Sequence, residues 1–100
     1  MKLNSIHWKN NIDLNNRLLI LGCGGHSKVV TEVAESIGFN NIVYLDLFYK
    51  DRFFFDRKVY QSINEDFNDY FFVAIGDNFS RERLYKKFLQ TNPRAKPLAL

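Results

Sequence analysis

The residues best suited to binding chemistry in this sequence stand in a glycine-rich loop. The stretch LLILGCGGHSKVV, residues 18–30, runs from four consecutive apolar residues through Gly22, Gly24 and Gly25 into a segment with helical spacing. Glycines let the main chain approach a ligand closely, and the free amides and positive dipole end of a helix start attract a phosphate. The pattern therefore predicts a phosphate-binding loop.

This loop matches the dinucleotide-binding fingerprint in part. The fingerprint has glycines at its first, third and sixth positions, and the sixth position here is Ser27. Asp46 ends the next predicted strand, where the dinucleotide-binding fold places an acid that accepts hydrogen bonds from a ribose hydroxyl. The two features in this order favour nucleotide binding. The alternative is a glycine turn that only packs a helix on a sheet.

The elements that must position this loop alternate along the chain. Apolar strands are expected at 18–21, 41–46 and 70–75, a shorter strand at 58–60 and a last one beginning in KPLAL, with helices near 26–37 and 79–91 and a helical turn at 62–67. Gly38 stands where the first helix needs a left-handed cap, and Pro93 closes the second. This alternation predicts a small three-layer, Rossmann-like α/β domain with a mainly parallel sheet and strand 18–21 at its centre.

Length and composition limit the classes of protein to which the chain can belong. One hundred residues suit a single domain, which we place at 17–100 after a polar leader at 1–16 that adds a short edge strand or hairpin. A net charge of +3 gives no indication of nucleic acid. The single Cys23 cannot form an intramolecular disulfide, and no metal site is expected. Without the apolar core of a signal peptide or a membrane span, the predicted location is the cytoplasm.

Aromatic residues crowd the segment 44–60, which contains the run FFF at 53–55. A small sheet buries few side chains on each face, and a large exposed apolar patch usually marks a partner surface. We therefore weigh an interface, with a protein partner or a second copy of the chain, against the alternative that the run at 53–55 completes the core.

The motifs LLILGCGGHSKVV, YLD and FVAIGDN, followed by a basic amphipathic helix and PLAL, resemble the N-terminal domain of the bacterial sugar O- or N-acyltransferases. That family includes the bacillosamine-pathway acetyltransferase and the sialic acid O-acetyltransferase. The resemblance spans residues 17–100 and implies a domain that binds a UDP-linked amino sugar. In the family a left-handed β-helix follows, binds acetyl-CoA and supplies the catalytic histidine. Leu100 falls about where the linker to that β-helix begins, so the resemblance implies a chain with no catalytic residue, inactive alone.

The resemblance also implies the residues of a substrate site. The residues implied for the pyrophosphate side are Gly22, Gly24, Gly25, His26 and Ser27. Asp46 is implied at the nucleoside, and the neighbouring loop contributes Gly76, Asp77 and Asn78. Because ligands of open parallel sheets bind outside the carboxyl ends of the strands, we expect these three loops to converge on one cleft.

Each of these residues also has a purely structural interpretation. Asp77 and Asn78 are residue types that cap helices, a loop histidine such as His26 is as often structural as ligand-binding, and Cys23 is expected to point into the core. Leu47 stands where many family members have a second acid, and Ser27 replaces the usual alanine and adds one hydrogen bond. Two other functions stay open: an NAD-type dinucleotide-binding domain, and a ligand-free assembly or remnant domain that docks another chain.

Overall fold

The computed structural model describes residues 13–63 and 66–98, whose strands form one six-stranded sheet. The elements follow the order β1 (Leu18–Leu21), α2 (Gly25–Ile37), β2 (Ile42–Leu45), β3 (Phe53–Phe54), β4 (Arg57–Tyr60), β5 (Tyr70–Val73), α3 (Asn78–Thr91) and β6 (Lys96–Pro97). Across the sheet the order is β3-β4-β2-β1-β5-β6, with β3 antiparallel to β4 and the other neighbours parallel. The predicted Rossmann-like, mainly parallel α/β sheet with β1 inside it is confirmed.

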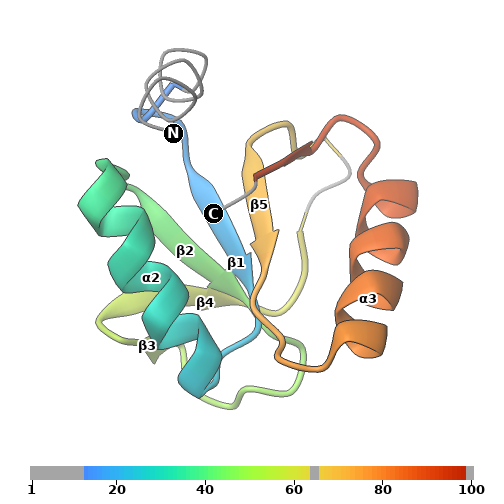
Figure 1. The fold of residues 1–100 in the computed structure, drawn as a ribbon, viewed down its shortest axis with the longest axis horizontal. Coiled ribbons are helices and arrows are strands. Elements are labelled where there is room, and N and C mark those ends of the chain that lie inside the picture. Colours follow the sequence, from blue (N-terminus) through green and yellow to red (C-terminus); the bar gives the residue numbers. More distant parts are fainter. Residues whose placement is uncertain (1–12, 64–65, 99–100) are drawn as a thin grey trace.

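The two helices cover opposite faces of the sheet (Figure 1). Leu18 and Ile20 of β1 pack in the cluster that holds the buried face of α2, whereas Leu19 and Leu21 pack in the cluster that holds Phe88 of α3. Successive side chains of a strand point to opposite faces, so a strand covered on both sides must be apolar throughout. This explains the unbroken run at 18–21 and confirms the three layers.

The predicted helix boundaries hold closely. Gly38 has a φ of +123°, and its N–H donates to the carbonyl oxygens of Ala34 and Glu35 at 3.2 and 3.0 Å, which closes the last turn of α2. At the end of α3 the Asn92 side-chain amide donates to the Phe88 carbonyl at 3.1 Å, directly before Pro93. Both ends were predicted because their causes are local.

The predicted helical turn at 62–67 is wrong at positions 62, 63, 66 and 67; positions 64 and 65 lie outside the described residues. Those four residues are not helical, and Phe67 is buried in the cluster on the α3 side of the sheet, with its ring centroid 5.9 Å from that of Phe88. Burial of one large side chain against a distant helix overrides weak local helical preference.

The short hairpin of β3 and β4 was not foreseen, although the strand predicted at 58–60 is confirmed within β4. The chain reverses at Phe55 and Asp56, which have φ values of 52° and 62°. Phe54 packs its ring edge-to-face on the fully buried Tyr44 with centroids 5.0 Å apart. Phe53 stays exposed, so the run at 53–55 only partly completes the core.

Of the leader, residues 1–12 lie outside the described part, so the predicted edge strand or hairpin is not described there. Residues 13–16 form a turn in which the Asn16 N–H donates to the Asp13 carbonyl at 3.0 Å. Within this turn, Leu14 is partly buried and packs against the apolar cluster on the α2 side of the sheet. Within the described residues, no helix has both the length and the apolar character needed to cross a membrane.

Candidate functional site

Gly22 lies where β1 ends, at the middle of the carboxyl edge of the sheet. Its φ is +110°, and a Cβ built there would lie 3.1 Å from the carbonyl oxygen of Ala74, just beyond β5. Its own N–H donates to the Leu45 carbonyl at the end of β2 at 2.9 Å. Both the backbone conformation and the lack of space therefore require glycine, and the loop begins wedged between the two neighbouring strands.

The start of α2 is capped from within the same loop. Gly24 is the N-cap; its N–H donates to the Ser27 hydroxyl oxygen at 2.7 Å, and that hydroxyl donates to the Gly24 carbonyl at 2.9 Å. Ser27 is fully buried. The predicted extra hydrogen bond of Ser27 is present, and it holds the loop together.

Two further amides at this helix start, those of Gly25 and His26, are not used by the protein's own hydrogen bonds within the described residues. In the part of the chain that the structure describes, the N–H groups of Gly25 and His26 donate no hydrogen bond, and the first turn carries no acidic residue. A Cβ added at Gly24 or Gly25 would meet nothing within 4 Å. Free amides at the positive end of a helix dipole favour an anion. His26 itself is exposed on this turn.

Asp46 joins the glycine loop to the loop after β2. One of its carboxylate oxygens accepts the Cys23 N–H at 2.9 Å, and the other accepts the Phe48 N–H at 2.9 Å. Each oxygen has a further lone pair, so the carboxylate still has capacity for a ligand hydroxyl. Sequence position suggested a ligand contact here, and the structure adds a structural role that ties two loops together.

Cys23 is half-buried and packs against the α2-side core, as expected for a small apolar residue. Burial first, and the nearby Asp46 carboxylate second, raise the pKa of its thiol to about 12. A thiol of this kind stays protonated at neutral pH, so Cys23 offers no nucleophile.

The third predicted loop, 76–78, leads from β5 into α3. Asp77 is the N-cap of α3 and its carboxylate accepts the Ser80 N–H at 2.7 Å, so the capping interpretation of Asp77 is confirmed. Hydrogen bonds from the Ser80 hydroxyl and then the Ser80 N–H lower the pKa of Asp77. Asn78 accepts a hydrogen bond from the Arg81 guanidinium. Gly76 is exposed, and a Cβ there would meet nothing within 4 Å.

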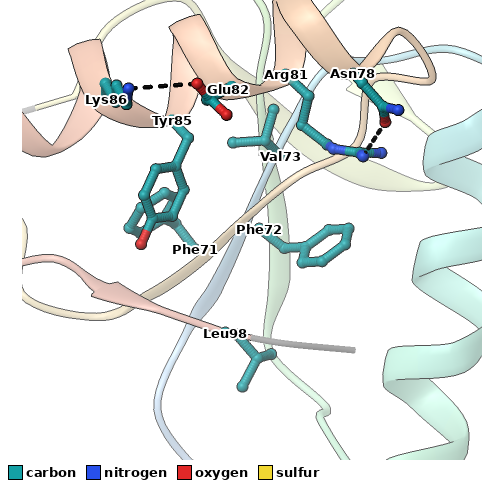
Figure 2. Close-up of a pocket in the computed structure, with 9 residues that line it drawn as sticks. All are labelled: Phe71, Phe72, Val73, Asn78, Arg81, Glu82, Tyr85, Lys86 and Leu98. Carbon is teal, nitrogen blue, oxygen red and sulfur yellow. Dashed lines mark hydrogen bonds and ion pairs between the residues drawn. The ribbon is translucent and has the colours of Figure 1, made fainter.

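Figure 2 shows a pocket of about 710 Å³ beside α3, with Arg81 next to Asn78 at one end. Phe71, Phe72 and Val73 of β5 line it, and Phe71 is the residue that pairs with the end of β6. Asn78 is the predicted site residue that lines it. Arg81 was not among the predicted site residues, and its guanidinium also donates to the Ile75 carbonyl at 3.4 Å. The spacing of three between Asn78 and Arg81 was the available signal.

Two of the three loops are bonded to each other, since the Cys23 N–H donates to Asp46. Gly22 lies against Ala74, two residues before the third loop at 76–78, and of the predicted site residues Asn78 alone lines the pocket. Among residues 13–63 and 66–98, no group of three or more His, Cys, Asp or Glu side chains is placed to hold a metal ion. The model of one protein family, described as the PglD N-terminal domain, matches residues 17–88. No solved structure matches the chain.

Proposed function

We propose that this chain, because it belongs to the PglD N-terminal domain family, binds a nucleotide-activated amino sugar linked to UDP. In PglD this domain binds the UDP-sugar substrate. The proposal places the pyrophosphate at the start of α2, the nucleoside beside Asp46 and the neighbouring loop at 76–78 along the rest of the ligand.

The contrast between the two helix starts carries this proposal. The start of α3 already holds a negative charge, since the Asp77 carboxylate caps it. The start of α2 has a glycine cap, no acidic residue in its first turn and the free N–H groups of Gly25 and His26. An anionic ligand is therefore favoured at α2 and repelled from α3.

Gly24→Val tests the phosphate position. The backbone of Gly24 is extended, with φ −141° and ψ −169°, and a Cβ there meets open space, so valine fits the fold. Its branched side chain would cover the approach to the amides of Gly25 and His26. We expect calorimetric titration with UDP-N-acetylglucosamine to show binding to the wild type and none to Gly24→Val. Circular dichroism checks that the variant is folded, and unchanged affinity in a folded Gly24→Val protein would contradict the proposal.

Asp46→Ala is expected to weaken binding less than Gly24→Val does. It removes about one charged hydrogen bond to the ligand, worth roughly 1.5 to 3 kcal/mol, together with the bonds from Cys23 and Phe48 that tie the two loops, but it adds no side chain over the amides of α2. Asp51→Ala, which removes an exposed carboxylate of the following loop, is the matched control and should leave the affinity unchanged. If Asp46→Ala changes the affinity no more than Asp51→Ala does, Asp46 does not contact the ligand.

A thermal-shift measurement with UDP-sugars, NAD and ATP separates the two alternative functions. A ligand that binds the native state raises its melting temperature by mass action. Stabilisation by NAD above that by UDP-sugars would favour a dinucleotide-binding domain. An absence of stabilisation by UDP-sugars, NAD and ATP would favour an assembly or remnant domain that docks another chain through its exposed aromatic residues.

A further inference from the structure

Phe48 lies in the loop after β2 and has no role in the proposed function as stated so far. Its side chain is 86% exposed, more than that of any other exposed large apolar residue in the described part of the chain. Scattered exposed apolar residues are common and need no explanation by themselves. The position of Phe48 relative to the phosphate loop is what gives its exposure a meaning.

The backbone of Phe48 is fixed to the glycine loop through one side chain. Asp46 accepts the Phe48 N–H with one carboxylate oxygen and the Cys23 N–H with the other, each at 2.9 Å. On the other side of Phe48, the Tyr49 ring packs edge-to-face on Phe54 with centroids 5.4 Å apart. The chain is therefore held before and after Phe48, while the phenyl ring itself stands in solvent.

We propose that the Phe48 ring is the platform on which the base of the bound nucleotide stacks. This inference rests on the proposed function, because it needs the phosphates at α2 to bring the ligand to the loop. A nucleobase has a flat π face that stacks on an aromatic ring and covers its apolar surface. Because Asp46 accepts both the Phe48 N–H and the Cys23 N–H, the backbone of Phe48 and the phosphate loop lie at the same edge of the sheet, where one nucleotide would contact both.

Stacking has a definite chemical consequence for ligand choice. Every base presents a π face, so Phe48 separates ligands that carry a base from those that do not, and it discriminates little among bases. The site is then one for nucleoside diphosphates and their sugar conjugates. Selection of uracil, where it exists, falls to groups that read the edge of the base.

The test compares four variants by calorimetric titration with UDP. Phe48→Ala removes the platform and Phe48→Leu keeps apolar bulk without a π face. Phe48→Trp restores an aromatic surface, and Phe53→Ala is the matched control, an exposed phenyl that lies on β3 and is 63% exposed. Loss of base stacking should weaken UDP binding about fivefold or more in Phe48→Ala and Phe48→Leu. Phe48→Trp should bind like the wild type, and so should Phe53→Ala.

Failure of this inference and failure of the proposed function give different results. If the wild type binds UDP and Gly24→Val does not, while Phe48→Ala binds as the wild type does, the platform is overturned and the proposed function stands. Equal weakening by Phe48→Ala and Phe48→Trp would also overturn it, since an aromatic ring would then be irrelevant. If the wild type binds no UDP at millimolar concentration, both fail together. Melting temperatures of all variants show whether any loss comes from unfolding.

Discussion

Single residues carry the main constraints at the carboxyl edge of the sheet, and Gly22 and Ser27 do so for different reasons. Gly22 is fixed by backbone conformation and by the Ala74 carbonyl 3.1 Å from where a Cβ would stand. Ser27 is fixed by its chemistry, because its buried hydroxyl both accepts from the Gly24 N–H and donates to the Gly24 carbonyl. A Gly at this sixth position of the fingerprint could not supply either bond. Ser27, which stands in place of the third glycine, therefore stabilises the loop through these two side-chain hydrogen bonds.

Gly22→Ala is expected to destabilise the protein by about 1 to 3 kcal/mol, since alanine must adopt a φ of +110° and meet a backbone oxygen that cannot move away alone. Gly76→Ala is the matched control, because no positive φ and no neighbouring atom within 4 Å oppose a methyl group there. It should change stability by less than about 1 kcal/mol. Urea unfolding monitored by circular dichroism measures both, and equal effects of the two variants would contradict the prediction.

At the scale of the element, the two helices start in electrically opposite ways. The start of α2 keeps two N–H groups free and has no acidic residue, whereas the start of α3 is capped by the Asp77 carboxylate. One helix start is thereby left for an external anion and the other is satisfied internally. An acidic N-cap at α2 and a glycine N-cap at α3 would therefore reverse which helix start favours an external anion.

The Asp77 cap should make the stability of α3 depend on pH. Hydrogen bonds from Ser80 lower the pKa of Asp77 in the folded state, so ionised Asp77 stabilises the protein above the pKa of the unfolded chain, near pH 4. This stabilisation is lost as the pH falls through the lower folded pKa. Asp77→Ala should therefore lower the urea midpoint at pH 7, and the gap to the wild type should narrow at pH 3.

Asp77→Asn is the control for this prediction. Asparagine also caps helices but cannot ionise, so this variant should lie between the wild type and Asp77→Ala at pH 7. A gap between the wild type and Asp77→Ala that stays constant from pH 7 to pH 3 would show that the charge of Asp77 contributes nothing.

For the whole molecule, the sheet order sets where the fold is most resistant to opening. β1 is hydrogen-bonded to β2 on one side and β5 on the other, and all four of its side chains are buried. β6 has two exposed residues and pairs with β5 alone in the described part of the chain. Local opening needs few broken contacts at β6, but opening at β1 disrupts both core clusters.

Native-state hydrogen exchange should reveal this gradient. We expect the bonded amides of β1 to exchange only through global unfolding, and those of Lys96 and Leu98, which donate to the carbonyls of Asp69 and Phe71, to exchange at least about tenfold faster. NMR-detected exchange at neutral pH measures both sets in one sample. Equal protection at β1 and β6 would contradict a fold organised around β1.

Sequence alone determined those features that have local causes. The unbroken apolar run at 18–21 predicted a strand covered on both faces, and helical spacing with Gly38 and Pro93 predicted two helices whose ends hold within about a residue. The glycine loop and Asp46 were identified by order along the chain. The family match at 17–88 agrees with the resemblance read from the same motifs.

Only the tertiary structure decided what those residues contact. Asp46 accepts a hydrogen bond from the Cys23 amide 23 positions away, and Ser27 is buried rather than open to a ligand. Phe67, which was predicted to end a helical turn, is not helical and packs on α3. The sequence does not single out Phe48 among its aromatic residues, whereas the structure links its backbone to the glycine loop through Asp46 and leaves its ring exposed. Periodicity and capping depend on neighbours within a few residues, whereas these contacts depend on which distant segments the sheet brings together.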